Sequence, residues 1–568
     1  MTSPRLRLAS IALLSVLLAV CATPTRAQTA ADALFFSQRL PATGPRLTAL
    51  GGASLAGIAD YGALYSNPAG LGYFEMSEVG GTFRMLLTTD ETTYETFDED
   101  GSSFGANRFS QSQTGYGLGN AALVYKVATQ RGSFVFSGAV NTTRVFDRQL
   151  DFRNQNELSS ISDFFLPLNN EVSVQQFAPG EGPTDLFFGQ ELIIGPDDAE
   201  YLVDFDPDGD GFINRPLSFA AFQTFGIDFA PGLFDGSNGA AAFLPVVSPG
   251  TQFQQVGDIS EDGALREVNL GSAFEASKGV MLGFSANITF GSYAYTDLFE
   301  EIDTQNQNDG TNGTVDFQRL RLTRSLDSDF GGFSLRGGLS ADVTENVRLG
   351  FTIETPTWYS IEETSNLRLL TDFDNGDRFV YGDDPAEDAG RTRFDYEIRT
   401  PWRLGGGLSV HAGGLRFLVD AVFVDWTQLK LDDEDETGFF DPENNVIEDT
   451  FDPVVNTRVG LEYNVSDLAL RAGFAYQPSP VTFSELGAAQ FGVGTGLNLR
   501  GMDAVNDPSR YTISAGIGYV FNDDLTLDVT WAQERFEDRT LPYTAPNASF
   551  VNEEVVRNRL LLGLRYRF

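Results

Sequence analysis

Residues 511–521 read YTISAGIGYVF, a stretch in which apolar side chains occupy every second position. Successive side chains of a strand point to opposite faces, so this stretch has one apolar face and one face of small or polar residues. The same period of two recurs from about residue 77 onward, most clearly in 347–354, 468–476 and 525–531. The pattern predicts an all-β chain.

The last strand, residues 558–568, reads NRLLLGLRYRF and ends on an aromatic residue. Its apolar side chains share one face and its arginines lie on the other. The strand resembles the C-terminal segment that the barrel-assembly machinery of bacterial outer membranes recognises, and Tyr566 and Phe568 would carry that signal. The alternative is an ordinary last strand of a soluble sheet.

Two all-β classes have strands with one apolar face, the soluble sandwich and the membrane barrel. Many strands here exceed the usual length of about 5–6 residues and end in aromatic residues, which favours the barrel. Tight turns also alternate with long polar connections, as they do in membrane barrels. The expected tight turns lie at 130–132, 277–279, 344–346, 411–414, 465–467 and 522–524.

The strands between these turns number fourteen, an even number that places both ends of the barrel on one side. We expect that side, with the short turns, to face the periplasm. Near residue 414 the expected strand has apolar residues on both faces, among them Phe417 and Leu418, and a β-bulge would reconcile them. The expected strands start near 77, 114, 132, 264, 279, 315, 347, 392, 414, 452, 467, 508, 524 and 552.

Residues 1–27 have the composition of a secretory signal peptide. Two arginines precede an apolar run over 8–20, and the small-x-small cleavage site TRA follows at 25–27. We expect Gln28 to be the first residue of the exported chain. The alternative is a lipoprotein modified at Cys21, but a bulky valine precedes this cysteine where a small residue is usual.

Composition excludes several classes of protein. Cleavage at residue 27 would remove the only cysteine, which excludes a disulfide framework and thiol catalysis. The net charge of -41 argues against nucleic-acid binding, which needs clustered Lys and Arg. Outside the signal peptide no stretch reaches about 18 apolar residues, so a helical membrane protein is also excluded.

Residues 50–72, LGGASLAGIADYGALYSNPAGLG, differ from the rest of the chain because they are rich in Gly and Ala and almost uncharged. Within them Asn67 and Pro68 favour a turn, and Gly70 permits a positive φ. We expect a compact segment of small residues that fits inside the lumen of the barrel.

An exported barrel with this stretch before its first strand resembles the FadL/TodX family of outer-membrane transporters of hydrophobic compounds. The resemblance implies a fourteen-stranded barrel plugged by an N-terminal hatch, in which Asn67, Pro68 and Ala69 form the hatch turn. It weakens between residues 154 and 263. Further stretches similar to the family are TPTWY at 355–359, TPW at 400–402, VDWT at 424–427 and LRAGFAY at 470–476.

The resemblance and the strand pattern together divide the chain into a signal peptide (1–27), a hatch (28–75) and a barrel (76–568). A long extracellular loop is expected at about 151–263. Its phenylalanines are interpreted as the loop's own small core, because exposed apolar patches are uncommon. The alternative is an outward surface that captures a hydrophobic ligand.

Enzymatic motifs are absent from the sequence. The only histidine, His411, falls in a predicted turn, so neither a Ser-His-Asp triad nor a histidine metal site has a basis. Gly115, Gly117 and Gly119 form a GxGxG pattern within a strand that opens no helix, which argues against a nucleotide loop. We expect no enzymatic activity.

One stretch, DPDGDGFIN from Asp206, matches the start of a calcium loop. Asp206, Asp208 and Asp210 would be ligands 1, 3 and 5, and Asn214 would occupy position 9. Leu217 replaces the glutamate expected at position 12, so any calcium affinity is weak. The alternative is an Asp/Gly-rich turn without an ion. No other cofactor is expected.

The predicted function is passive inward transport of hydrophobic small molecules, such as long-chain fatty acids or aromatic hydrocarbons. We expect a monomer in outer-membrane lipid, with both chain ends periplasmic. The family implies capture at the outer loops, transfer to a pocket and release when the hatch shifts. The alternative is a FadL-like barrel that serves as a surface-protein shuttle or secretion component, in the manner of PorV. A third possibility is an adhesin or purely structural barrel.

Overall fold

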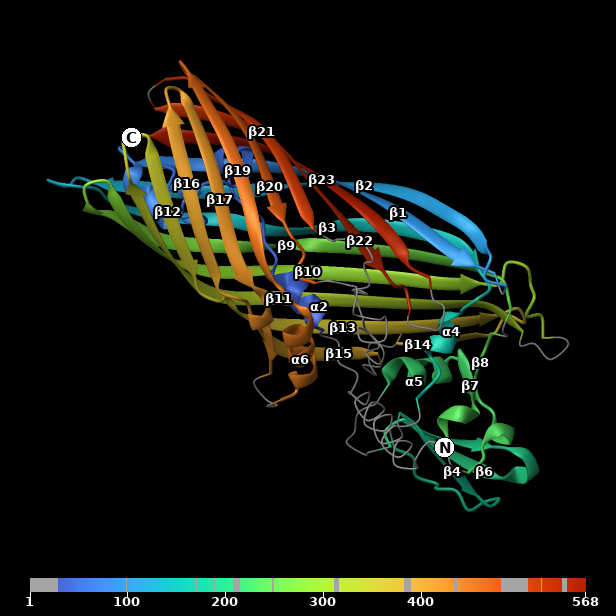
Figure 1. The fold of residues 1–568 in the computed structure, drawn as a ribbon. Coiled ribbons are helices and arrows are strands. Elements are labelled where there is room, and N and C mark those ends of the chain that lie inside the picture. The colour runs from blue at the N-terminus through green and yellow to red at the C-terminus, as the bar shows by residue number, and fades with distance from the viewer. Residues whose placement is uncertain are drawn as a thin grey trace, which may run out of the picture.

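The computed structural model describes residues 29–568 apart from 99, 169–170, 188, 208–214, 237, 248–249, 311–315, 383–389, 434–437, 482–508, 523 and 544–548 (Figure 1). The described residues form a closed antiparallel barrel, a segment inside it and a small domain at one end. The expected signal peptide, 1–27, lies outside them. None of the helices described is long and apolar enough to cross a membrane.

The barrel wall has fourteen antiparallel strands, which confirms the predicted fold class. Pairing of the first strand, β1, with the last, β23, closes the sheet. The hydrogen-bonded sheet contains 18 strands because three wall strands are each broken into two elements, and because β14 (Arg378–Tyr381) only extends a loop.

The unbroken wall strands are β1 (Glu78–Phe97), β2 (Ser103–Val127), β3 (Phe134–Asn156), β9 (Phe253–Ser277), β10 (Val280–Ile302), β11 (Phe317–Asp342), β19 (Pro453–Val465), β20 (Leu468–Gln477), β21 (Arg510–Val520), β22 (Leu525–Thr540) and β23 (Val551–Arg567). The broken ones are β12 (Val347–Glu354) with β13 (Trp358–Phe373), β16 (Arg403–Ala412) with β15 (Arg391–Arg399), and β17 (Leu415–Asp425) with β18 (Lys430–Asp432).

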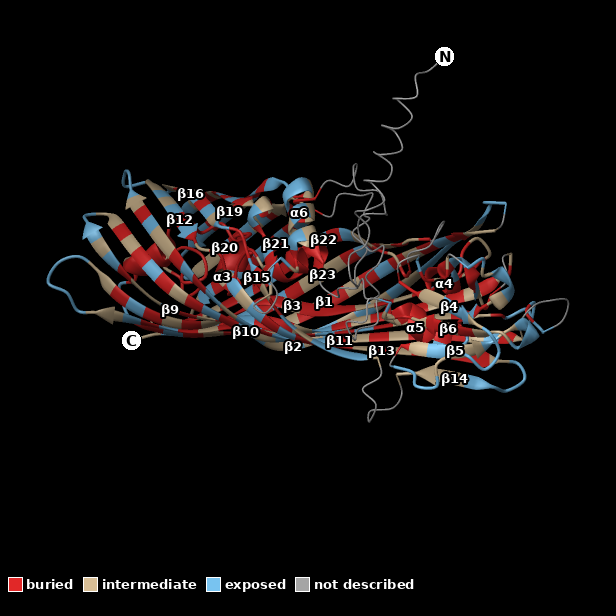
Figure 2. Ribbon diagram, turned by 90° about the horizontal axis from the view of Figure 1, so that it is seen from below, coloured by how far each residue is buried: buried red, intermediate tan, exposed pale blue. Residues whose placement is uncertain are grey.

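Large apolar side chains cover the outside of the wall. Ile513 and Ile517 of β21 are exposed, whereas Thr512 and Ser514, on either side of Ile513, are buried, as the alternation predicts. Figure 2 shows the resulting bands of buried and exposed residues along the strands. The wall is paired all round at its short-turn end and its apolar belt suits hydrocarbon, so it has the properties of a membrane-spanning barrel.

Six short connections lie at one end of the barrel, where β1 begins and β23 ends (Figure 1). Their positions agree with the predicted tight turns. That this end faces the periplasm stays a prediction. The connections span 128–133, 278–279, 343–346, 413–414, 466–467 and 521–524.

Two wall strands start earlier than the sequence indicates. β2 begins at Ser103 and β9 at Phe253, whereas the expected starts are 114 and 264. The outer part of β2 is exposed on both faces, and the outer part of β9 mixes charged with apolar side chains on its buried face, so neither has an apolar stripe. The long connection after β3 therefore spans 157–252 rather than 151–263.

The bulge predicted near residue 414 is wrong, because β17 pairs with both of its neighbours without a register shift. Phe417 and Phe423 face outward, while Leu418 and Val422 are buried inside. Leu418 packs with Leu47 and other residues of the N-terminal segment. This strand has two apolar faces because the lumen that it borders is filled with protein.

The wall is taller on one side than on the other (Figure 1). β1, β2, β3, β9, β10 and β11 contain 20 to 26 residues each, and β19, β20 and β21 only 10 to 13. The tall strands continue beyond the shorter ones at the end opposite to the short turns.

Residues 157–252, here called the loop domain, fold at that far end. They form a three-stranded sheet, a two-stranded sheet and short helices. Most phenylalanines are buried, including Phe165, Phe205 and Phe229, which agrees with the loop-core interpretation; Phe187 is exposed. Its elements are α4 (Ile161–Phe164), β4 (Ser173–Phe177), β5 (Gln190–Ile194), η2 (Pro196–Asp198), β6 (Glu200–Asp204), α5 (Pro216–Gln223), β7 (Ile227–Phe229), η3 (Pro231–Leu233), η4 (Ala240–Ala242) and β8 (Phe243–Pro245).

Residues 29–75, here called the N-terminal segment, lie inside the barrel. They comprise α2 (Ala30–Ser37), α3 (Pro45–Ala49) and η1 (Pro68–Tyr73). Hydrogen bonds join the segment to strands around the whole circumference, including β11, β17, β19, β21 and β22. At its start, the Ala30 amide donates to Glu443 of α6 (Asp441–Thr450), which lies between β18 and β19 at the far end.

Candidate functional site

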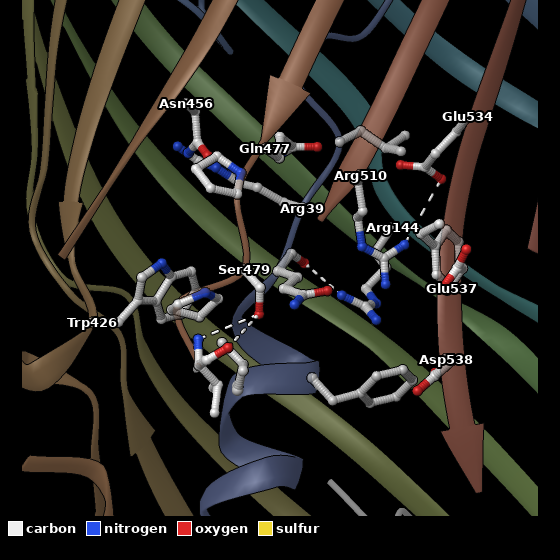
Figure 3. A pocket seen from close by; sticks show the side chains of 18 of the residues that line it. Arg39, Arg144, Trp426, Asn456, Gln477, Ser479, Arg510, Glu534, Glu537 and Asp538 are labelled. Atoms are coloured by element: carbon white, nitrogen blue, oxygen red, sulfur yellow. Dashed lines mark hydrogen bonds and ion pairs between the residues drawn. The ribbon is translucent and has the colours of Figure 1, made fainter. Parts of the chain in front are cut away.

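A cavity of about 150 Å³ lies inside the barrel between α2 and the far ends of β20, β21 and β22 (Figure 3). An engineered cavity of about this volume holds benzene, so the space suits one aromatic ring. Its apolar lining includes Leu34, Phe35, Trp426, Val481 and Phe536. Its charged lining consists of Arg39, Arg144, Arg403, Arg510, Arg557, Glu534, Glu537 and Asp538.

Two breaks in the wall place Trp426 and Arg403 at this cavity. A short turn, η5 (Trp426–Gln428), separates β17 from β18 and turns Trp426 inward, where it is buried. In the neighbouring strand Pro401 has no N–H and cannot continue the ladder, and Arg403 follows two positions later as the first residue of β16. The Arg403 guanidinium lies 5.6 Å from the centre of the Trp426 ring, a cation–π arrangement.

The helix α2 forms the opposite wall of the cavity. Thr29 and Asp32 cap its first turn reciprocally, and all eight residues of the helix are buried. A helix that is buried all round needs apolar neighbours on every side. Phe35 and Phe36 supply the contacts toward the barrel wall, with ring centroids 5.5 Å and 5.3 Å from Tyr293.

One continuous cluster of buried apolar residues connects the loop domain with the cavity. It contains Phe165 and Phe205 of the loop domain, Phe299 of the tall wall, and Phe35 of α2. Within it, Phe299 lies 5.3 Å from Tyr543 and 6.2 Å from Phe152. The apolar interior is therefore continuous from the loop domain to the cavity.

Charged side chains lie on both sides of the cavity, and Arg403 is the one beside Trp426. Figure 3 shows Arg144, Arg510 and Glu534 grouped together, across the cavity from Trp426. Glu534 is buried and is 4.0 Å from Arg510 and 3.9 Å from Arg557. The Arg510 guanidinium also lies 3.7 Å from the centre of the Phe536 ring.

A smaller cavity of about 40 Å³ continues toward the short-turn end and shares Arg39, Leu40 and Arg403 with the first. Arg39 forms a two-fold ion pair with Glu354, the last residue of β12. Glu354 also accepts from Arg336, at 3.0 Å and 3.2 Å. These pairs narrow the lumen where the N-terminal segment begins to fill it.

The N-terminal segment is anchored beyond this point by buried polar contacts. Asp420 of β17 accepts hydrogen bonds from the amides of Ser54 and Leu55, at 2.6 Å and 2.8 Å. Ser54 and Leu55 lie outside helices and strands, so their amide groups have no partner in secondary structure. The Asp420 carboxylate supplies an acceptor for both. The segment thus has fixed contacts with the wall.

The predicted hatch turn lies in the most enclosed part of this segment. Asn67 is fully buried, its Nδ2 donates to the Leu55 carbonyl at 2.6 Å, and its Oδ1 accepts from the Ala69 amide at 3.0 Å. Pro68 starts η1. The turn packs on two wall glycines, because a Cβ on Gly283 would lie 2.3 Å from the Ala69 nitrogen and one on Gly338 would lie 2.0 Å from Asn67 Oδ1.

The wall strands β2 and β3 pair only near the short turn that joins them, at the end of β2 and the start of β3. They pair only from Asn120 to Val127 of β2, although β2 starts at Ser103 and β3 ends at Asn156. Beyond this stretch β3 contacts β1 instead, where the Thr92 hydroxyl donates to the Asp151 carbonyl at 2.7 Å. We call the unpaired stretch the β2–β3 separation.

The glycines of the GxGxG pattern lie beside this separation. A Cβ on Gly115 would lie 2.7 Å from Asp147 Oδ2, and one on Gly117 would lie 3.2 Å from Arg84 Nη2. Their missing side chains leave room for β3 and for inward side chains of β1. The pattern therefore has a packing reason at this point of the wall.

None of the other predicted residues that the structure describes lines the cavity. His411 is the second-last residue of β16, just before the short turn, and accepts a hydrogen bond from Arg416 at 2.6 Å. Tyr566 and Phe568 face outward at the end of the chain, as predicted. Asp206 of the calcium-like loop is partly exposed, and Asp208, Asp210 and Asn214 lie outside the described residues, so the calcium site stays a prediction.

Sequence reasoning did not identify the residues that line the cavity. A usable signal existed in the strands, because Arg510, Arg557 and Glu534 occupy inward positions of strands whose other face is apolar. Trp426 reaches the cavity because of a break in the wall, and α2 reaches it because of the path of the N-terminal segment. Neither feature can be read from the alternation of apolar and polar residues.

No protein-family model and no curated protein matches this chain. Among solved structures it is similar to a FadL homologue of Pseudomonas aeruginosa, at 12% identity and a TM-score of 0.48, over 93% of this chain and 99% of that chain. It is similar to the toluene transporter TodX of P. putida, at 13% identity and a TM-score of 0.45, with the same coverage. The toluene transporter TbuX of Ralstonia pickettii, also 13% identical, has a TM-score of 0.41 over 93% of this chain and 99% of its own. In structure the chain is similar to FadL-type transport proteins, the family that residues 50–72 resemble in sequence.

Proposed function

We propose that this barrel is a passive route by which hydrophobic small molecules with one aromatic ring cross the outer membrane. The continuous apolar cluster from the loop domain to the ring-sized cavity carries the proposal. An apolar solute cannot partition readily into a polar cell surface, and a protein path with an apolar lining removes that barrier.

In this proposal the loop domain and the tall wall receive the solute, and the cavity between α2 and Trp426 holds it. The N-terminal segment acts as a hatch, since its anchored residues occupy the lumen beyond the cavity. The solute leaves sideways at the β2–β3 separation, which avoids displacing the segment. No energy coupling is required, because the concentration gradient drives the solute.

The test is uptake of radiolabelled toluene and of radiolabelled oleate by a deletion strain that carries the wild-type gene or a variant. Ala31→Phe adds a ring to the cavity side of α2 and is expected to reduce toluene uptake at least five-fold. The matched control is Ala515→Phe, which adds the same ring to the outward face of β21 and is expected to leave uptake unchanged.

Two results would contradict the proposal. One is equal toluene uptake with and without the gene. The other is normal uptake of every solute together with a loss of surface proteins, which would favour the PorV-like shuttle instead. Uptake of oleate but not of toluene would move the substrate class to long-chain fatty acids.

A further inference from the structure

The inner wall beside the β2–β3 separation contains polar atoms without hydrogen-bond partners. Thr88 of β1 is fully buried, and its hydroxyl forms no hydrogen bond with any residue that the structure describes. Thr88 lies directly opposite Gln113 of β2 on one side and Arg557 of β23 on the other. Gln113 Oε1 and Arg557 Nε are also buried without a partner among the described residues. The three side chains occupy one row across three neighbouring strands.

More atoms of this kind lie next to the row, toward the short-turn end. Arg84 Nε and Nη1 and Arg559 Nε and Nη2 are buried and donate to no acceptor in the described chain. Asp147 Oδ1 of β3 is buried and accepts from no donor there. Arg84 and Asp147 also lie against the unpaired stretch of β2, because a Cβ on Gly117 or Gly115 would lie 3.2 Å from Arg84 Nη2 or 2.7 Å from Asp147 Oδ2. We call these atoms and the row the polar cluster.

The polar cluster begins at the cavity. Arg557 lines the cavity together with Glu534, which lies 3.9 Å from it. From Arg557 the row continues through Thr88 to Gln113, at a point where β2 has no pairing with β3. The polar cluster therefore lies between the cavity and the sideways exit proposed above.

The polar cluster contains donors and acceptors alike. The guanidinium groups donate, the carboxylate and amide oxygens accept, and the threonine hydroxyl does both. Carboxylates lie among the arginines, since Asp147 interacts electrostatically with Arg84 and Arg557, and Glu534 with Arg557 and Arg559. A neutral group that both donates and accepts, such as water or a hydroxyl, therefore suits the polar cluster better than an anion.

A solute on the proposed sideways route has to pass the polar cluster. A hydrocarbon that excludes water there leaves buried donors and acceptors without partners, and each such group costs free energy. A ring with a hydroxyl group loses less, because the hydroxyl accepts from a guanidinium and donates to an oxygen. The volume of the cavity suits either ring, so discrimination falls to the polar cluster.

We infer that the route selects neutral aromatic solutes that carry a hydroxyl group over hydrocarbons of the same shape. This inference rests on the proposed function, since it names the substrate class of the same route.

The experiment compares the uptake of radiolabelled 4-methylphenol and 1,4-dimethylbenzene, two rings of nearly the same shape, by a deletion strain with and without the gene. We expect the gene-dependent uptake rate to be at least five-fold higher for 4-methylphenol. Thr88→Val keeps the shape of the side chain but removes its hydroxyl, and should lower 4-methylphenol uptake about five-fold, as expected for one hydrogen bond. Arg84→Met should lower it about ten-fold, because a guanidinium forms charge-assisted hydrogen bonds. Neither variant should lower the uptake of 1,4-dimethylbenzene.

The matched control is Thr371→Val on β13. Thr371 is also fully buried with an unpartnered hydroxyl among the described residues, but β13 pairs with neither β1 nor β2. Its uptake of both solutes should equal that of the wild type, after normalisation to the folded barrel seen in unheated membrane samples. Equal gene-dependent uptake of the two solutes, or an equal loss of 4-methylphenol uptake in Thr371→Val, would overturn the inference.

The inference and the proposed function fail separately. Isothermal titration of the full-length barrel in detergent with 4-methylphenol measures binding without transport. If toluene uptake depends on the gene but 4-methylphenol and 1,4-dimethylbenzene enter equally, the inference fails and the function stands. If 4-methylphenol binds about five-fold more weakly to Thr88→Val than to the wild type, but no aromatic solute crosses the barrel, the selectivity stands and the transport function fails.

Discussion

Arg46 of the N-terminal segment and Glu462 of β19 form a bidentate ion pair, with two nitrogen–oxygen distances of 2.9 Å. Glu462 is buried and also pairs with Arg471 at 2.7 Å and with Arg416 at 3.5 Å. One carboxylate therefore joins the segment to the wall and neutralises two wall arginines.

This arrangement predicts unequal costs for its two partners. Arg46→Met leaves Glu462 with two arginines, so it should lower the free energy of unfolding by about 1–3 kcal/mol. Glu462→Gln leaves Arg46 and Arg416 without their counter-charge, whereas Arg471 keeps Asp528 at 2.6 Å, and should cost about 3–5 kcal/mol. Guanidinium unfolding in detergent, followed by tryptophan fluorescence, measures both values. Equal costs would show that the pair does not hold the segment.

The buried turn predicts a defect in closure rather than in assembly. Replacement of Asn67 and Pro68 with alanine, which makes residues 67–69 Ala-Ala-Ala, removes the Asn67 hydrogen bonds to Leu55 and Ala69, each worth about 1 kcal/mol. We expect the heat-modifiable folded barrel to form at wild-type levels, with faster hydrogen exchange over residues 50–72. Solute uptake should change. Unchanged uptake would reduce the segment to a structural cork.

If the solute leaves at the β2–β3 separation, a large side chain in place of one of the glycines there should obstruct its exit. Gly117→Phe meets only the flexible end of Arg84, so the barrel should still fold, while the ring obstructs the proposed path. Toluene uptake should fall at least five-fold. Gly331→Phe is the matched control, because a Cβ there contacts nothing within 4 Å and the residue is exposed. A similar loss in both variants would argue against a sideways exit.

The outward aromatic end of β23 predicts an assembly phenotype. Tyr566 and Phe568 are both exposed and their rings lie 6.4 Å apart, where a receptor could reach them. Tyr566→Ala with Phe568→Ala should reduce the amount of folded barrel in the outer membrane several-fold. Leu562→Ala removes a comparable exposed side chain but keeps the aromatic end, and should assemble normally. Immunoblots of unheated membrane samples give the folded fraction.

The sequence predicts those parts of the barrel in which one face meets lipid. The starts of β10, β12, β17 and β20, at 280, 347, 415 and 468, are each within one residue of the expectation, because lipid imposes a strict alternation there. The outer parts of β2 and β9 were not predicted. Water or the loop domain surrounds them, and neither environment requires a strict alternation of apolar and polar residues.

The cavity is harder to foresee for a different reason. Arg403 and Trp426 are brought into contact by breaks in adjacent strands. Phe35, which also lines the cavity, belongs to a helix almost 400 residues earlier in the chain. Such contacts depend on tertiary placement rather than on any local period. The hatch turn was predictable because Asn67 and Pro68 have intrinsic turn preferences that the tertiary fold uses unchanged.

The two apolar faces of β17 bear on the order of folding. If the wall closed around empty space, Leu418 and Val422 would be left facing water, as would the apolar residues of the N-terminal segment that pack with Leu418. Closure of the β1–β23 seam and filling of the lumen are thus thermodynamically coupled events. An isolated wall, expressed without its first 75 residues, would lack the apolar residues of the N-terminal segment that cover the inner face of β17.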